Sequence, residues 1–259
     1  MAGNKPGFLI ETALLTHGLY SVDDQLLVDI WPKDIGLLAW VEKGEIKTGN
    51  IKDYIPFRKQ SSRLMRIDCF NLDKALSEGL SGALTASGTM AVCAKMGIPL
   101  AVTGGMGGIG DIKGEQLCPD LPALRDLPVA LISTSPKDML DIPATIGWLM
   151  DSGVSVYGRY SPSCTGFMFK HDLVKITGVY NGELPLKKML LLYEIPAEKR
   201  LTDMSILRRA IAAGKEAEAK GQYYHPAANR MIDVLTEGKS SLLQLDSIIL
   251  NAKWAKMLV

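Results

Sequence analysis

Lys137 comes shortly after a strongly apolar run, which is an unusual place for a lysine. In the segment VALISTSPKDMLDIP, residues 129–132 are apolar, residues 133–135 carry small hydroxyl side chains, and the amine comes two residues later. Taking an ammonium group out of water is costly unless it is paired or its pKa falls. An amine with a lowered pKa is a nucleophile that can form a Schiff base with a carbonyl. Taken alone, however, the segment favours an ordinary solvated lysine on a loop.

A carboxylate and a glycine-rich loop follow two other apolar runs. Glu11 ends the run at residues 7–10, and TGGMGGIGD at residues 103–111 follows the run at residues 98–102. The backbone N–H groups of such a loop can cradle an anion. The loop lacks the lysine and hydroxyl of a P-loop, and no helix pattern follows at once as a dinucleotide fingerprint requires. We therefore expect no nucleotide cofactor.

The elements that must position these groups alternate between strand and helix patterns. Strands are expected at residues 7–10, 36–41, 98–102, 129–132, 154–159 and 190–195, with an edge strand at 63–68. Helices are expected within residues 72–97, from Asp120 as an N-cap, from Pro143 to residue 152, and at 203–220, 226–236 and 240–258. Irregular residues 160–169 are a candidate lid loop. The small hydroxyl residues within 81–90 fit either a polar pocket wall or close helix packing.

This alternation predicts a three-layer α/β/α fold with a largely parallel mixed sheet, in one domain spanning residues 1–259. In such sheets the ligand crevice forms at the carboxyl ends of the strands. Glu11, the glycine loop and Lys137 all fall at such ends. Their convergence makes a functional lysine the better interpretation.

Composition narrows the classes of partner. The 259 residues carry a net charge of +1 without long charged runs, so we expect no nucleic acid partner. No signal peptide and no span long enough for a membrane is expected. The four cysteines lie far apart and the three histidines share no ligand spacing, which fits reduced thiols in a cytoplasmic protein and makes a zinc enzyme improbable. A small-molecule substrate is expected.

With these segments side by side, the chain resembles the pseudouridine-5′-phosphate glycosidase family, also called indigoidine synthase A-like. The matching pieces are IETALLTHGL, GALTASGTMAVCAKMGI, VTGGMGGIG, the PDL around Asp120, and STSPKDMLDIPAT, in collinear order over about residues 8–196. The resemblance implies reversible cleavage of the C–C bond between uracil and C1′ of pseudouridine 5′-phosphate. It further implies that a glutamate donates a proton as the sugar ring opens and that a lysine captures C1′ as an imine.

Carried onto this sequence, the resemblance makes Glu11 the proton donor, Lys137 the Schiff-base lysine and Asp120 a group for substrate binding and proton transfer. Thr85 and Ala86 match the helix start that touches substrate, and the matching segments extend the expected substrate site to Gly104, Gly105, Cys118 and Pro119. Two plainer interpretations remain open. Glu11 could be a solvated turn residue, and Asp120 could be a helix cap alone.

Several positions depart from the family pattern. Arg66 replaces a substrate-binding lysine, and it keeps the charge but changes the geometry. The position of the Mn²⁺-ligating aspartate is Gln116, a neutral amide that suits a hard cation poorly, with Glu115 or Asp111 as possible substitutes. A histidine of the family becomes Gly110 or Asp111. The segment Asn-Pro-Ile-Pro becomes YEIP at residues 193–196, which removes an amide from the expected pocket.

These features leave three functional hypotheses. The first is a lysine-dependent C-glycosidase that converts pseudouridine 5′-phosphate and water to uracil and ribose 5-phosphate, or acts on a close analogue. The second is a C-glycoside synthase of secondary metabolism that joins ribose 5-phosphate to a non-uracil acceptor, because the pocket surroundings are altered. The third is a non-catalytic paralogue that binds a sugar phosphate. The resemblance further implies a homotrimer.

Overall fold

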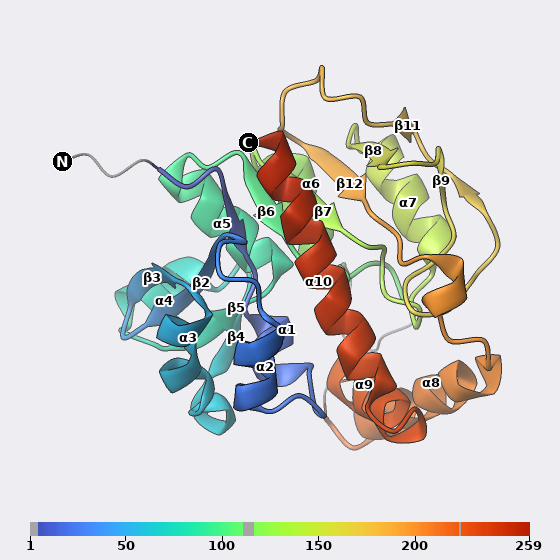
Figure 1. Cartoon of the computed structure of the whole chain (residues 1–259), viewed down its shortest axis with the longest axis horizontal. Helices are drawn as coiled ribbons and strands as arrows, with labels where there is room; N and C mark the ends of the chain where they lie inside the picture. Colours follow the sequence, from blue (N-terminus) through green and yellow to red (C-terminus); the bar gives the residue numbers. More distant parts are fainter. Residues whose placement is uncertain (1–4, 111–116, 223) are drawn as a thin grey trace.

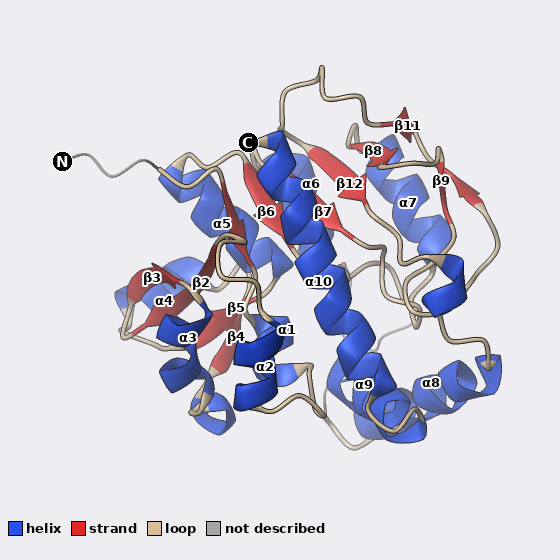
Figure 2. Cartoon of the chain, viewed as in Figure 1, coloured by secondary structure: helices blue, strands red, loops and turns tan. Residues whose placement is uncertain are grey.

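A ten-stranded sheet organises the molecule (Figures 1 and 2). The computed structural model describes residues 5–110, 117–222 and 224–259. The strands run in the order β11-β8-β12-β7-β6-β1-β2-β5-β4, with β3 paired to β2. The sheet strands are β1 Phe8–Ile10, β2 Leu37–Glu42, β3 Glu45–Gly49, β4 Met65–Ile67, β5 Gly82–Leu84, β6 Leu100–Val102, β7 Ala130–Ser133, β8 Ser155–Gly158, β11 Gly178–Val179 and β12 Met189–Leu192. A separate pair is formed by β9 Ser163–Cys164 and β10 Val174–Lys175.

Helices cover both faces of the sheet. They are α1 Ala13–His17, α2 Asp24–Ile30, α3 Ile51–Arg58, α4 Leu72–Ser77, α5 Ala86–Met96, α6 Asp120–Asp126, α7 Ile142–Asp151, α8 Met204–Ala219, α9 Tyr224–Leu235 and α10 Lys239–Leu258, with 3₁₀ turns at Ser61–Arg63 and Ala197–Lys199. In β1, Leu9 packs in one apolar core with α4 to α7, whereas Phe8 and Ile10 pack in the other with α2, α3 and α10. Successive strand residues point to opposite faces, so both faces are buried. The three-layer α/β/α prediction is confirmed.

The sheet is largely parallel. Among the pairings of this ten-stranded sheet within the described residues, only β2–β3 and β2–β5 are antiparallel. Strand β2 extends past the carboxyl end of β1, and β5 pairs with this extension, Trp40 facing Ala83. As a result, β5 runs back toward the end of β1, where the backbone N–H of Thr12 donates to the Leu84 carbonyl at 3.2 Å. The carboxyl ends of β1, β5, β6 and β7 therefore meet at one place.

The helix-rich segment expected at residues 72–97 does contain two helices, but they are separated by a strand that the sequence does not predict. The structure divides it into α4, β5 and α5. Gly79 has a φ of +68°, a left-handed conformation that suits glycine and ends α4. The following Gly82–Leu84 is buried between β2 and β4, where a helix would not fit.

The prediction of a lid loop at residues 160–169 is wrong for the second half of that segment. Its second half holds Phe167, Met168 and Phe169, which are buried in a third apolar cluster with α8 and α9. Burial of three large side chains fixes this segment in the core. The sequence contains the apolar residues, but their partners lie in the C-terminal helices.

Candidate active site

Glu11 lies at the carboxyl end of β1, as expected. Its backbone N–H donates to the Val102 carbonyl, and its carboxylate accepts a hydrogen bond of 2.6 Å from the Thr103 hydroxyl. The side chain is buried. Burial raises the pKa of Glu11 to about 7, against the lowering effect of the Thr103 hydrogen bond and of Lys137. A carboxyl group with this pKa can both donate and accept a proton near neutral pH. A solvated turn residue is excluded.

Lys137 is delivered by the turn after β7. Its backbone N–H donates to the Met106 carbonyl, which attaches the turn to the glycine loop. Burial and the positive charge of Arg66 lower the pKa of Lys137, while the carboxylates of Glu11 and Asp120 oppose that shift. A lysine with a lowered pKa has more of the neutral, nucleophilic amine at neutral pH. The arrangement suits imine formation.

Asp120 does not cap its helix as expected. The N-cap of α6 is Pro119, and the Asp120 side chain instead accepts backbone hydrogen bonds from Ser87 at 2.9 Å and from Gly107 at 2.7 Å. This buried carboxylate therefore joins the start of α5 to the glycine loop. Its charge also acts on Glu11 and Lys137, so it belongs to the same site.

The other side of the site is built by β4 and the start of α5. Thr85 is the N-cap of α5 and accepts from the Gly88 N–H through its hydroxyl, and Ala86 is buried beside it. Arg66 lies on β4 with an exposed side chain. Its charge influences the pKa values of Glu11 and Lys137, so a cation faces the site from the solvent side.

The predicted glycine and cysteine contacts have packing roles. A Cβ on Gly104 would lie 2.8 Å from the Leu14 side chain, and one on Gly105 would lie 2.6 Å from the Phe167 ring. Cys118 is buried near Lys137, whose pKa responds to it. Pro119 accepts a weak hydrogen bond from the Cys69 thiol at 3.6 Å. Whether these residues contact a substrate stays a prediction.

The described residues do not provide a metal centre. Gln116, Glu115 and Asp111 lie outside them, and no group of three His, Cys, Asp or Glu side chains within residues 5–110, 117–222 and 224–259 is arranged to hold an ion. Both Asp120 oxygens already accept backbone N–H groups. Binding of Mn²⁺ therefore stays a prediction, and we derive no chemical step through it.

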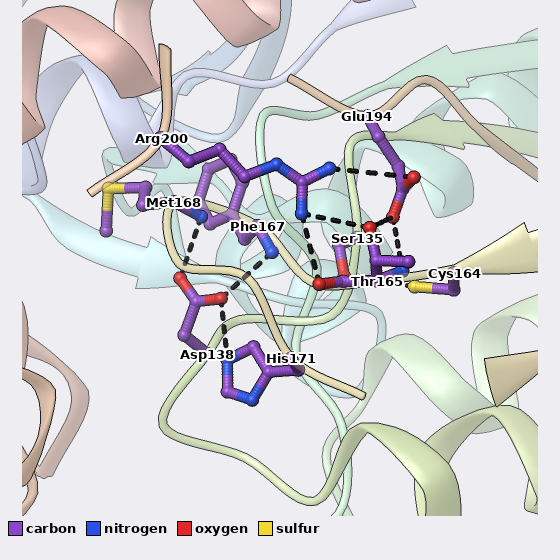
Figure 3. Close-up of polar contacts among 9 residues, drawn as sticks. All are labelled: Ser135, Asp138, Cys164, Thr165, Phe167, Met168, His171, Glu194 and Arg200. Atoms are coloured by element: carbon purple, nitrogen blue, oxygen red, sulfur yellow. Dashed lines mark hydrogen bonds and ion pairs between the residues drawn. The ribbon is translucent and has the colours of Figure 1, made fainter. Parts of the chain in front are cut away.

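A second polar network holds the chain next to Lys137 (Figure 3). The buried carboxylate of Asp138 accepts from the backbone N–H groups of Phe167 and Met168, at 2.9 and 2.8 Å, and hydrogen-bonds with His171 at 3.1 Å. Asp138 thus ties the lysine turn to the buried segment that supports Gly105.

The segment at residues 193–196 is occupied by other contacts. Glu194 accepts from the Thr165 hydroxyl at 2.9 Å and pairs with Arg200 at 3.5 Å. Tyr193 packs edge-on against Trp254, with the Arg159 guanidinium 4.3 Å from the Tyr193 ring centroid. Both side chains therefore have partners in the protein.

Sequence reasoning missed three polar residues that organise the site. Thr12 donates to the Ala39 carbonyl at 2.7 Å and accepts from the Leu84 N–H at 3.0 Å, which joins β1 to the β2–β5 pair. Thr103 binds Glu11. Asn251 of α10 binds the ends of β6 and β7. Thr103 could have been found as the first polar residue after an apolar run, whereas nothing local marks Asn251.

The family model described as indigoidine synthase A-like protein matches residues 10–190. The chain belongs to the indigoidine synthase A-like family. Glu11, Asp120 and Lys137 all lie within the matched region. The family assignment from sequence motifs is confirmed.

Named relatives agree with this assignment. The chain is 25% identical to a pseudouridine-5′-phosphate glycosidase of Petrotoga mobilis, covering 96% of this chain and 90% of the relative. It is 27% identical to one of Alkaliphilus metalliredigens, over 98% and 90% of the two chains. Both relatives carry the name of an enzyme, which agrees with the expectation that this family member is an enzyme.

Two solved structures share the fold. An indigoidine synthase A-like protein of Thermotoga maritima superposes with a TM-score of 0.78 at 19% identity, covering 98% of this chain and 92% of the other. The prealnumycin C-glycosynthase AlnA, solved with ribulose 5-phosphate, gives a TM-score of 0.76 at 22% identity, over 98% and 91%. These similarities establish the architecture shared with this chain.

Proposed function

We propose that this chain is a lysine-dependent enzyme that cleaves or forms the C–C bond between C1′ of ribose 5-phosphate and a heterocycle. The observation that carries the proposal is that a buried carboxyl of raised pKa, Glu11, and a lysine of lowered pKa, Lys137, lie within electrostatic range of each other at the carboxyl ends of their strands. The family assignment supports the same chemistry, and so do the names of the relatives. Pseudouridine 5′-phosphate is the proposed substrate.

The proposed reaction uses one proton donor and one nucleophile. Glu11 donates a proton to the ring oxygen as the C1′–O4′ bond breaks, and the neutral amine of Lys137 forms a bond to C1′. The attacking nitrogen then loses a proton, and its lone pair forms the C1′ imine as the bond from C1′ to uracil breaks. The electron pair of that bond stays on the uracil carbon, which takes up the proton released by the nitrogen. Water then hydrolyses the imine, which releases ribose 5-phosphate and restores the amine.

The surrounding charges favour a phosphorylated substrate. Arg66 faces the site from the solvent side, and Thr85 places the start of α5 beside it. A guanidinium and a helix N-terminus both favour anions. The ribulose 5-phosphate bound to AlnA, a protein of the same fold, supports a sugar phosphate in the corresponding pocket.

Borohydride trapping tests the proposed function. Incubation of the protein with ribose 5-phosphate and borohydride, read by intact mass and peptide mapping, is expected to place a reduced sugar adduct on Lys137. Lys137→Ala is expected to lose the adduct, and Lys175→Ala, at an exposed lysine on β10, is expected to keep it. A Lys137→Ala protein that traps and turns over substrate like the parent would contradict the proposal. Absence of both adduct and turnover, even with added Mn²⁺, would identify the non-catalytic paralogue.

A synthase with a non-uracil acceptor is the second candidate function. It is favoured by Tyr193, an aromatic residue packed with Arg159 and Trp254 where the resemblance leads one to expect an amide for the pocket. Comparing turnover of pseudouridine 5′-phosphate with that of other C-nucleotides separates the two candidates. Preference for pseudouridine 5′-phosphate would contradict the synthase.

Two further expectations concern the oligomeric state and the cellular location of the protein. The homotrimer stays a prediction, which light scattering on the purified protein can test. None of the four cysteines, which all lie within the described residues, forms a disulfide, in agreement with the expected reduced thiols. None of the described helices is long and apolar enough to cross a bilayer. We propose a cytoplasmic location on the cysteine argument.

A further inference from the structure

Helix α10 carries several buried polar residues. From Ser241 to Asn251 they recur at intervals of three or four residues, which places them along one face of the helix. They are Ser240, Ser241, Gln244, Ser247 and Asn251. Figure 1 shows α10 crossing one face of the sheet along its length. Gly104, whose missing Cβ would lie 3.3 Å from the Ser247 hydroxyl, lets the glycine loop approach this helix closely.

Asn251 reaches the ends of two strands at once. Its fully buried side-chain amide donates to the Thr103 carbonyl at 2.7 Å and to the Thr134 hydroxyl at 3.1 Å, with a longer contact to the Gly104 carbonyl at 3.4 Å. Within the described residues, its carbonyl oxygen has no hydrogen-bond partner. A buried oxygen without a partner opposes stability, so packing alone does not account for an amide here.

Helix docking does not require this amide. The same helix packs Ile248, Ile249, Ala252, Trp254 and Ala255 into one of the two large apolar cores. Such apolar burial is the main force that holds a helix on a sheet. The distinctive effect of Asn251 is therefore the fixed spacing it imposes between the end of β6 and the end of β7.

The end of β6 contacts one reacting group, and the end of β7 leads to the other. Thr103, held through its carbonyl, donates its hydroxyl hydrogen to Glu11. Thr134, held through its hydroxyl, precedes Lys137 by three residues, and its backbone N–H donates to the Gly104 carbonyl at 2.8 Å. We propose that Asn251 is a positioning residue that fixes the acid Glu11 and the nucleophile Lys137 relative to each other. The inference rests on the proposed function.

Two substitutions separate positioning from packing. Asn251→Leu keeps the branched shape of the side chain but removes the donors, and Asn251→Asp replaces them with a carboxylate directed at two carbonyl oxygens. Both are expected to lower kcat and the rate of borohydride trapping by about tenfold to a hundredfold, while KM changes less than about threefold. Asn229→Asp is the matched control, since it makes the same amide-to-carboxylate change at a buried position on α9.

The pH profile gives a readout that packing would not move. Lys137, Asp120 and Arg66 face Glu11 with their charges, and Tyr54 of α3 also lies within its electrostatic range. These groups are unchanged in the variants. If Asn251 holds Thr103 on Glu11, the uncharged substitution Asn251→Leu moves the basic limb of the profile to higher pH, because the hydrogen bond that lowers the pKa of Glu11 weakens. Asn229→Asp is expected to leave the limb where it is.

Thr134→Val provides a milder test if the Asn251 variants fold poorly. It removes one contact of the amide, whereas Thr134→Ser keeps the hydroxyl. Slower trapping in the valine variant and parental trapping in the serine variant are expected. Parental kcat, trapping rate and pH profile in folded Asn251 variants, or in Thr134→Val, would overturn the positioning role. A parent protein that traps no sugar would instead contradict the proposed function.

Discussion

The Thr103 hydroxyl donates a hydrogen bond of 2.6 Å to Glu11, and this contact stabilises the charged form of a carboxylate that burial disfavours. The two opposing effects leave the pKa of Glu11 at about 7. The pKa of Glu11 therefore depends on a residue that follows β6, the strand that pairs with β1. The properties of Glu11 depend on the spacing between these two strands.

Thr103→Val is expected to raise the pKa of Glu11 further. The substitution conserves volume and removes the hydroxyl, so the basic limb of the kcat/KM profile moves about one pH unit higher. Measurement of kcat/KM across pH checks this. Thr103→Ser, which keeps the donor, is the control, and an unchanged limb in the valine variant would show that Glu11 does not govern that limb.

Glu11→Gln is expected to stabilise the protein at alkaline pH. Because the folded pKa, about 7, lies above the ordinary value of 4.5, the folded state binds more protons than the unfolded state between these values. Stability therefore falls as pH rises from 4.5 to 7, by up to about 3 kcal/mol. The glutamine variant lacks this dependence. Urea denaturation at pH 5 and pH 8 measures this pH dependence of stability. An equal dependence in variant and parent would contradict the raised pKa of Glu11.

Asp120→Asn is expected to destabilise the fold by about 1–3 kcal/mol. The Asp120 carboxylate accepts two backbone N–H groups, and an amide can accept one of them while directing its own hydrogens at the other. Thermal denaturation measures the loss. Asp126→Asn, at the exposed end of the same helix, is the control and is expected to change stability by less than about 0.5 kcal/mol. Comparable losses in the two variants would argue against a structural role for Asp120.

Gly107→Ala is expected to disturb the glycine loop and abolish most of the activity. A Cβ there would lie 2.1 Å from the Cys118 sulfur, so the loop must shift, at a cost of about 1–3 kcal/mol. Adding Cys118→Ala removes the clash and is expected to restore part of the stability and turnover. Gly147→Ala, on α7 with no atom within 4 Å of the added Cβ, is expected to stabilise by up to about 1 kcal/mol. Failure of the double variant to recover would contradict the steric explanation.

The sequence predicts the groups that lie at the ends of its apolar runs. Glu11 and Lys137 each follow such a run, so strand periodicity is enough to place them at one edge of the sheet. Both positions can be recognised from neighbouring residues alone. The family motifs then indicate a reaction, which the strand pattern does not predict.

What the sequence does not predict depends on contacts between distant segments. The hydrogen-bond partners of Asp120 lie 33 and 13 residues away in the sequence. Its local sequence therefore indicates a helix cap, whereas in the structure its carboxylate joins two distant segments. β5 is hidden in a run of small residues, because only its pairing with β2 makes it a strand. Asn251 contacts Thr103, which lies 148 residues away in the sequence, and no local sequence pattern predicts that contact.

This last contact bears on how the protein is made. Strands β1, β6 and β7 leave the ribosome long before α10, and the contact between Asn251 and their ends cannot close until that helix has emerged. A nascent chain with a complete sheet would therefore carry the nucleophile and the acid without their final spacing. We expect catalytic competence to appear as one of the last events of synthesis, after most of the core has formed.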